Sequence, residues 1–412
     1  METSRKPRNI KLHNEKLVIR ILSGAESMPA SEIAAKANLS ITSVMKILVA
    51  LQNAKAVKSI GKGCSTEEGG KRPELFAVNE EYLYSLGCLV DTAFLRITLM
   101  DFRHNVVDTA ERSWDHPQNV EAALDALAGS IRKMVSDHGL TPENICGIAV
   151  GLNGIIDADK GILRHPVLDI PWGKNTPVGE MLHSRLHDFH HIRVDNTGRY
   201  LSYALLLTHP EYADKTVFSI FVGTHTVGCL LDKSEMQRGY NGFLGEVGHM
   251  TILPGYRGRR CSCGSYGCFE SLVSDEAVAD QAKEIGKDWP DDPLCKAYCA
   301  GEAHLPDLFK AANEGSEFAL TVVRKVAGYF AQLIRNVLLS CDPQIIVING
   351  VYGGAGEAFR NAVLDAVSDI AFFDIDTRTS LEFISSENVI TKADIGAAFY
   401  ALERYLRHTE EI

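Results

Sequence analysis

The sequence lacks long hydrophobic runs. No stretch of its 412 residues reaches the roughly 18 consecutive apolar residues that a membrane-spanning helix requires. The N-terminal segment METSRKPRNIKLHNEK is basic and polar, and the apolar segment of a secretory signal does not follow it. We therefore expect a cytoplasmic protein without a membrane partner.

The sequence also lacks the cysteine pattern of a secreted, disulfide-rich domain. Most of its ten cysteines are scattered among apolar neighbours, as expected for reduced core thiols in a reducing compartment. Three of them, Cys261, Cys263 and Cys268, instead fall within eight residues, twelve positions after His249. Free thiols or disulfide partners are the alternative interpretation of this cluster, although a Cys-x-Cys pair rarely closes on itself.

The spacing of this cluster is that of metal ligands. Tetrahedral zinc binds thiolates and imidazoles, and the glycines between the cysteines allow the tight turn that brings several thiolates to one point. We predict one structural zinc ion, with no open coordination position for catalysis, held by His249, Cys261, Cys263 and Cys268.

The formal net charge of −11 conceals an asymmetry along the chain. Residues 1–72 carry a net charge of +7, which leaves −18 on the remainder. A basic segment on an acidic body is typical of a DNA-binding protein with a separate sensing domain, because phosphate contacts need local positive charge. A charged segment alone is more often a solvated surface.

Helical periodicity begins near Leu12, and two short helices are expected over 30–37 and 41–51. Their three-residue turn and shared apolar stripe predict a helix-turn-helix, although a plain helical hairpin packed on another element is the alternative. The second helix begins after Ser40, its expected N-cap. Near that end it presents residues suited to DNA contact, namely Ser40, Thr42, Ser43 and Lys46.

Residues 56–78 read as two short strands around a glycine-rich loop, the shape of a winged helix. Lys71 and Arg72 in this segment are expected to reach the DNA backbone or the minor groove. We place a DNA-binding domain at residues 1–78 and a body at 79–412.

The body alternates strands and helices, which predicts an α/β fold. An order of three-strand meander, helix and strand occurs at about 86–150 and again at about 217–348. The last strand of the first meander is expected at residues 106–107, and a helix between the two copies is expected over 200–207. This duplication predicts two related lobes with a cleft between them.

At this point the chain resembles the ROK family of sugar-responsive transcriptional repressors and sugar kinases. The resemblance is carried by the segment GEVGHM from Gly245, by the cysteine cluster and by Glu270, and it extends over nearly the whole chain. It implies a two-lobed, actin-like ATPase (ribonuclease H-like) body. The N-terminal helix-turn-helix, followed by Gly70-Lys71-Arg72-Pro73, resembles the repressor branch specifically.

The resemblance also assigns roles to individual residues. Glu246 and Glu270 correspond to carboxylates that hold sugar hydroxyls, and His249 to a zinc ligand that lies next to the sugar. Asn196 matches an asparagine that contacts the sugar, and Gly154 belongs to a loop that lines the same cleft. A carboxylate can accept hydrogen bonds from two adjacent hydroxyls, which agrees with these roles.

The chain departs from the kinase pattern at the positions that carry chemistry. Thr197 occupies the place of the aspartate that removes the sugar hydroxyl proton, and threonine is no general base at neutral pH. Asp195 is the alternative base. Both expected phosphate loops, at 91–96 and 223–228, have lost glycines that would let backbone N–H groups approach phosphate.

These features favour a sugar-responsive DNA-binding regulator, most simply a repressor, that forms a homodimer or homotetramer, binds operator DNA and has no catalytic residues. The first alternative is an ATP-dependent sugar kinase with an atypical base. The second is a regulator that responds to a protein partner instead of a sugar.

Overall fold

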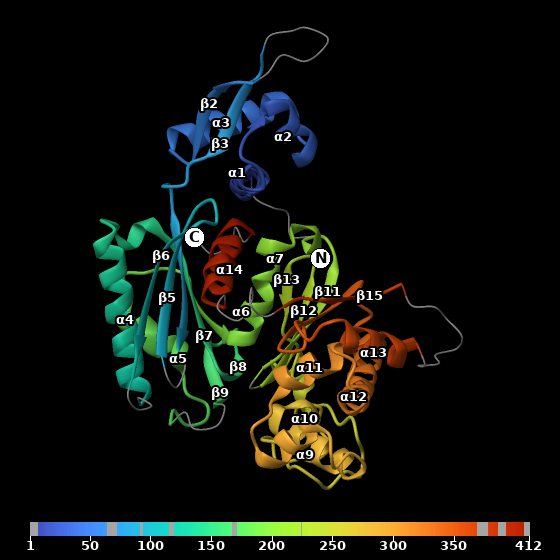
Figure 1. The fold of residues 1–412 in the computed structure, drawn as a ribbon. Helices are drawn as coiled ribbons and strands as arrows, with labels where there is room; N and C mark the ends of the chain where they lie inside the picture. The colour runs from blue at the N-terminus through green and yellow to red at the C-terminus, as the bar shows by residue number, and fades with distance from the viewer. Residues whose placement is uncertain are drawn as a thin grey trace. The chain divides into compact units, whose positions relative to one another are not determined.

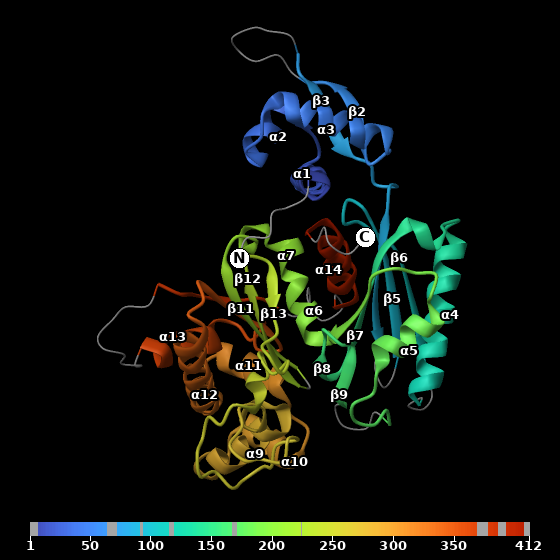
Figure 2. The same ribbon diagram turned by 180° about the vertical axis from the view of Figure 1, so that it is seen from behind.

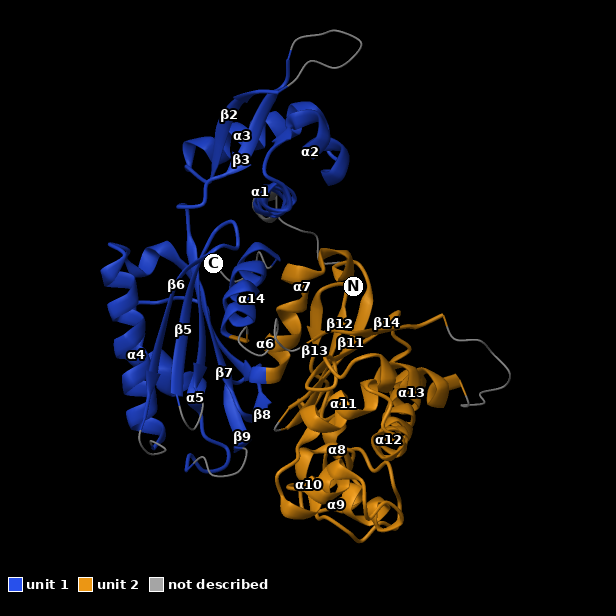
Figure 3. Cartoon of the chain, in the orientation of Figure 1, with its two compact units in different colours: residues 1–197, 394–412 blue, residues 198–393 orange. Residues whose placement is uncertain are grey.

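The computed structural model describes residues 7–63, 72–90, 94–114, 119–166, 171–223, 225–368, 378–385 and 393–407. The chain divides into two compact units (Figure 3). The first unit comprises Met1–Thr197 and Asp394–Ile412, and the second comprises Gly198–Ala393. The N-terminal module therefore belongs to the same unit as the first lobe of the body.

The N-terminal module consists of three helices and a small sheet with strand order β1-β3-β2 (Figure 1). Its elements are α1 (Pro7–Ser23), β1 (Met28–Pro29), α2 (Ala30–Ala37), α3 (Ile41–Asn53), β2 (Val57–Lys62) and β3 (Glu74–Val78). Helices α2 and α3 are bent by 110° at their junction, within the roughly 90–120° of a helix-turn-helix. Ser40 caps α3 as predicted, because its side chain accepts a hydrogen bond from the backbone N–H of Ser43 at 3.1 Å.

The core of this module does not end at residue 78. The predicted apolar stripe of α2 and α3 is packed inside, with Ile33 and Val44 fully buried. The same cluster includes side chains of the body, namely Phe102, Cys146, Leu402 and Leu406. This shared core explains why the module and the first lobe form one unit.

The first lobe is built on a five-stranded sheet with order β10-β7-β4-β5-β6, in which β7 runs parallel to β4 and to β10. The strands are β4 (Tyr84–Val90), β5 (Phe94–Asp101), β6 (Val106–Ser113), β7 (Ile145–Leu152) and β10 (Ile192–Asn196). A separate hairpin joins β8 (Gly154–Asp157) to β9 (Ile162–Pro166). The helical elements are α4 (Val120–Asp137), η1 (Pro142–Asn144), α5 (Val178–Arg185) and α14 (Ala393–Arg407).

Helices cover both faces of this sheet, with α4 and α5 on one side and α14 on the other (Figures 1 and 2). Alternation along β4 sends Leu86 and Cys88 into the core with α4 and α5. Gly87 points to the opposite face, where an added Cβ would lie 1.8 Å from the carbonyl oxygen of Asp394. Only glycine allows α14 to pack this closely on the strand.

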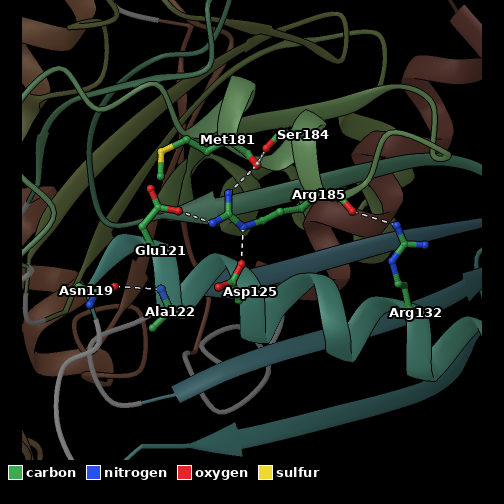
Figure 4. A network of polar contacts seen from close by, with 8 residues as sticks. All are labelled: Asn119, Glu121, Ala122, Asp125, Arg132, Met181, Ser184 and Arg185. Atoms are coloured by element: carbon green, nitrogen blue, oxygen red, sulfur yellow. Dashed lines mark hydrogen bonds and ion pairs between the residues drawn. The ribbon is translucent and has the colours of Figure 1, made fainter.

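A polar network joins α4 to α5 (Figure 4). Arg185 of α5 donates a hydrogen bond to Asp125 Oδ1 at 2.7 Å and forms an ion pair with Glu121. Arg132 of α4 donates to the carbonyl oxygen of Arg185 at 2.9 Å. Because both acidic partners are exposed, we assign these pairs a role in aligning the helices more than in stability.

The second unit contains the other five-stranded sheet, with order β13-β12-β11-β14-β15 and β14 parallel to β11. Its strands are β11 (Thr216–Val222), β12 (Thr226–Asp232), β13 (Glu235–Gln237), β14 (Ile345–Gly350) and β15 (Ser380–Phe383). Its helices are α6 (Thr197–Tyr203), which starts at the last residue of the first unit, α7 (Leu205–Thr208), η2 (Pro210–Tyr212), η3 (Val247–His249), α8 (Glu270–Val273), α9 (Asp275–Ile285), η4 (Gly286–Asp288), α10 (Pro293–Ala300), α11 (Leu305–Asn313), α12 (Glu317–Cys341) and α13 (Glu357–Ser368).

The predicted duplication of meander, helix and strand is confirmed, because each lobe places a later parallel strand beside the first strand of its meander. Two details were wrong. The expected helix over 200–207 is divided into α6 and α7, where Leu207 N–H bonds to the carbonyl of Ala204 three residues back. Strand β6 extends to Ser113 although only residues 106–107 were expected, because all of this edge strand is exposed and carries no apolar pattern.

Among the described residues, no single helix is long and apolar enough to cross a membrane. The pair α2 and α3 reaches the required length and composition only when taken together, across its 110° bend.

Candidate metal and ligand site

The cysteine cluster lies on a tight turn of the second unit. Cys261 N–H bonds to the carbonyl of Ser265 at 2.9 Å, and Gly264 N–H bonds back to the carbonyl of Cys261 at 2.9 Å. Gly264 has φ +91°, and a Cβ on Gly267 would lie 2.2 Å from the carbonyl oxygen of Leu253. These two positions need glycine, as the sequence predicted.

The turn brings three of the four predicted metal ligands within mutual reach and places the fourth, Cys268, beside Cys263. His249 Nδ1 lies 3.4 Å from Cys261 Sγ, and Cys263 Sγ lies 3.7 Å from Cys268 Sγ. The donor atoms of His249, Cys261 and Cys263 all lie within 4.8 Å of one another. Two sulfurs bound tetrahedrally at the usual zinc–sulfur distance would be about 3.8 Å apart, so this arrangement could hold a metal ion and fits zinc.

The thiols of this cluster differ in acidity. Burial acts against ionisation of Cys263, but hydrogen bonds from the Ser265 backbone and from neighbouring side chains outweigh it and lower its pKa. The alternative of a disulfide is wrong for Cys261, Cys263 and Cys268, since all three are free cysteines. Burial raises the pKa of Cys268 to about 12 and also raises the pKa of Cys261. A thiolate at these positions therefore needs a cation beside it.

The pKa values of two carboxylates next to the cluster are shifted in opposite directions. Burial raises the pKa of Glu246, which stands just before the η3 turn that carries His249. Burial also acts against ionisation of Glu270, but the nearby His225 imidazole and the backbone N–H of Thr226 outweigh it and lower the pKa of Glu270. The charge of His249 lowers the pKa of both carboxylates, and the charge of Glu270 raises the pKa of Glu246, so the predicted trio is close enough to interact.

Arg199, which was not predicted from the sequence, is a further charged residue close to Glu246. Its side chain is 2% exposed and donates hydrogen bonds to the carbonyl oxygens of Gly242 at 2.6 Å and Leu244 at 3.3 Å. Its positive charge favours ionisation of Glu246. Arg199 thus fixes the segment that leads into Glu246 and tunes its carboxylate.

The remaining two predicted sugar residues lie in the first unit, where they contact each other. Asn196 Nδ2, at the end of β10, donates a hydrogen bond to the carbonyl oxygen of Gly154 at 2.8 Å. Gly154 has φ +151°, and an added Cβ would lie 2.4 Å from the carbonyl oxygen of His165 on β9. The hairpin β8–β9 therefore requires glycine at this position.

The environment of Asp195 differs from that of Thr197. Thr197 is half-buried at the first residue of α6, whereas Asp195 is 1% exposed and its Oδ1 accepts the N–H of Asn196 at 2.8 Å. Asp195 is thus held within the strand end. The first expected phosphate loop overlaps residues 91–93, which lie outside the described residues.

The predicted DNA-contacting side chains are exposed where the structure describes them. Ser40, Thr42, Ser43 and Lys46 lie on the exposed face at the start of α3, and Arg72 is exposed ahead of β3. Lys71 lies outside the described residues.

Three further residues of the site were not identified from the sequence. The Nδ1 atom of His225 lies 3.8 Å from Glu270 Oε2, and the N–H of Thr226 donates a hydrogen bond to the same oxygen at 2.8 Å. The Oγ atom of Ser262 donates a hydrogen bond to Glu270 Oε1 at 3.2 Å. The only hint was that His225 stands where the family resemblance predicts a glycine.

Comparison with known proteins extends this description. The ROK family model matches residues 93–404. The DNA-binding transcriptional dual regulator NagC of Escherichia coli is 25% identical over 92% of this chain and 89% of its own. The xylose repressor of Caldicellulosiruptor bescii is 26% identical over 76% of this chain and 77% of its own. A glucokinase of Halalkalibacterium halodurans is 29% identical over 64% of this chain and 82% of its own.

Among solved structures, a ROK family transcriptional regulator described as a homologue of the E. coli MLC protein superposes with a TM-score of 0.76 and 21% identity over 97% of both chains. This likeness confirms the predicted fold, including the N-terminal region. Because the family model covers most of the body and the motif around Glu246, His249 and the cysteines is present, the chain belongs to the ROK family.

Proposed function

We propose that this protein is a sugar-responsive, DNA-binding transcriptional repressor whose kinase-like body binds a sugar or sugar derivative. One observation carries the proposal. A capped helix-turn-helix with exposed Thr42, Ser43 and Lys46 shares a core with a body that presents paired carboxylates beside a candidate metal cluster. The xylose repressor and the transcriptional dual regulator NagC among the relatives support a role in transcription.

In this proposal, the exposed start of α3 contacts base edges and phosphates, and Lys71 and Arg72 contact the backbone. Zinc held by His249, Cys261, Cys263 and Cys268 keeps the turn in place. Glu246, His249 and Glu270 of the second unit bind sugar hydroxyls, and the family resemblance gives Gly154 and Asn196 of the first unit sugar-binding roles as well. The protein acts in the cytoplasm as a homodimer or homotetramer.

DNA binding is tested with fragments taken from upstream of the genes that neighbour its own. We expect a retarded complex whose affinity falls steeply between about 50 and 200 mM salt, because phosphate contacts release counterions. Lys46→Ala and Arg72→Ala should each weaken binding. Lys283→Ala, which removes the same charge from an exposed position on α9, is the matched control and should not weaken binding. Absence of salt-sensitive binding to any such fragment would refute the proposal.

Effector binding is tested by thermal shift against sugars, amino sugars and sugar phosphates, followed by operator release. A ligand that stabilises the protein should also dissociate the DNA complex. Glu246→Ala should abolish both effects. If Glu246→Ala releases operator like the wild type, the input is instead a protein partner.

A sugar kinase is the second candidate, supported by the glucokinase relative. We propose that the body does not transfer phosphate, since threonine stands at the expected base position and the neighbouring Asp195 is buried and hydrogen-bonded. A coupled assay over hexoses and amino sugars with ATP tests this. Turnover that survives Thr197→Ala but is lost in Asp195→Ala would identify an atypical kinase.

A further inference from the structure

The hairpin between β11 and β12 lies against the metal and carboxylate cluster instead of standing apart from it. Gly228 N–H bonds to the carbonyl of Gly245 at 2.6 Å, and a Cβ on Gly248 would lie 2.7 Å from the carbonyl oxygen of Thr226. The start of β12 therefore packs backbone to backbone on the segment Gly245–Gly248, which carries Glu246. This hairpin is the stretch that resembles a phosphate loop.

Two groups of this hairpin face Glu270, one through a hydrogen bond and one at ion-pair distance. The N–H of Thr226 reaches Oε2 at 2.8 Å, and the Nδ1 atom of His225 lies 3.8 Å from the same oxygen. A backbone N–H that is donated to a side-chain carboxylate does not serve a phosphate group. In the described part of the loop, a backbone N–H that a nucleotide site would direct at phosphate is directed at the Glu270 carboxylate instead.

The metal turn supplies the donor on the other side of Glu270. Ser262 stands between Cys261 and Cys263, and its Oγ donates to Oε1 of Glu270 at 3.2 Å. Both carboxylate oxygens are thus held from different loops. The Glu270 side chain is 12% exposed, which leaves part of its surface accessible.

We propose that His225 and Ser262 are positioning residues for Glu270, and that they set the affinity and the hydroxyl specificity of effector binding. This inference rests on the proposed function, because it assumes that Glu270 binds sugar hydroxyls. A carboxylate held at both oxygens presents its remaining lone pairs in fixed directions, so it favours hydroxyl pairs of one geometry.

The test combines protein variants with deoxy analogues of whichever sugar stabilises the wild-type protein. The variants are His225→Gly, which restores a glycine, His225→Asn, which keeps a donor, and Ser262→Ala. Calorimetry should show at least tenfold weaker binding of the parent sugar to His225→Gly and Ser262→Ala, about 1.4 kcal/mol each. His225→Asn should recover part of that loss.

The deoxy analogues separate positioning from a general structural effect. The analogue that lacks the Glu270-bound hydroxyl should bind the wild type weakly. If the variants misorient Glu270, this analogue should bind them almost as well as it binds the wild type, because it makes no bond to Glu270 in either protein. Equal fold losses for every analogue, or wild-type affinity in His225→Gly, would overturn the inference. If no sugar binds the wild type at all, the proposed function has failed instead.

Folding of the variants is checked independently. Zinc content and thermal midpoint of Ser262→Ala should match those of the wild type, because Ser262 is not one of the predicted metal ligands. A variant that loses zinc is replaced by Ser262→Thr, which keeps the hydroxyl and should bind the sugar as the wild type does. Weak binding by zinc-loaded Ser262→Thr would count against the role of the hydroxyl.

Discussion

Lys16 of α1 donates a hydrogen bond to the carbonyl oxygen of Tyr405 in α14, 389 residues later in the chain. Its ammonium group also lies 4.2 Å from the centre of the Tyr405 ring, and the residue is 4% exposed. A buried cation on the last turns of α14 interacts favourably with that helix end and ties the N-terminal module to the first lobe.

We expect Lys16→Met to destabilise this attachment by about 2 kcal/mol, the size of a hydrogen bond to a charged group. Limited proteolysis should release the module faster in the variant, and denaturant titration should show the loss. Tyr405→Phe is the matched control, since it keeps both the backbone carbonyl and the ring. A Lys16→Met protein with wild-type protease resistance would show that the contact does not hold the module.

Replacement of a predicted metal ligand should remove the ion. Metal analysis should give one zinc per chain for the wild type and well under one for Cys263→Ser, with a lower thermal midpoint, because structural zinc contributes directly to folding. Cys299→Ser is the matched control, since Cys299 is also an exposed free cysteine. An unchanged zinc content in Cys263→Ser would exclude this residue as a ligand.

Arg199 should be sensitive to conservative replacement. Arg199→Lys keeps the charge but cannot donate to two carbonyls with one planar group, so we expect a loss of about 1–2 kcal/mol in unfolding free energy. Arg199→Met also removes the charge that favours ionised Glu246, and it should weaken effector binding more than Arg199→Lys does. Equal effector affinity in the two variants would show that the charge is irrelevant to the site.

The stability of the first unit should depend on the protonation of His104. Burial lowers the pKa of His104 even though Glu403 and Asp101 favour its charged form. Below about pH 6.5 the unfolded chain then binds a proton that the folded chain does not. The unfolding free energy therefore falls as the pH is lowered, by up to about 1.4 kcal/mol per pH unit, until the pH passes the folded-state pKa of His104.

His104→Asn should remove this component of the pH dependence. Asparagine tolerates the left-handed conformation that His104 adopts at φ +66°. The comparison is made between slopes of unfolding free energy against pH from 7 to 5, because the variant also loses the ring contact with Phe399. Identical slopes in both proteins would mean that His104 titrates alike when folded and unfolded.

Gly154→Ala tests the hairpin that carries one of the predicted sugar residues. The new methyl would meet the backbone of β9, so we expect a destabilisation on the order of 1–3 kcal/mol together with weaker effector binding. Gly139→Ala is the matched control, because it also has positive φ but open space around it. Unchanged effector binding in Gly154→Ala would show that this hairpin does not contribute to the ligand site.

The sequence by itself determined the helix-turn-helix, the duplicated lobes and the metal turn, because each rests on local chemistry. Apolar periodicity, the Ser40 cap and cysteines separated by glycine act over a few residues and need no distant partner. Edge strand β6 was underestimated for the same reason, since its exposed residues carry no such pattern.

Only the tertiary structure decided which distant residues serve the site. Arg199 bonds to carbonyl groups more than 40 residues away, and Thr226 and Ser262 reach Glu270 from two separate loops. Lys16 likewise finds its partner at the opposite end of the chain. A hydrogen bond between such residues depends on how strands and turns are brought together, and a single polar residue in the sequence gives no sign of the partner it will meet.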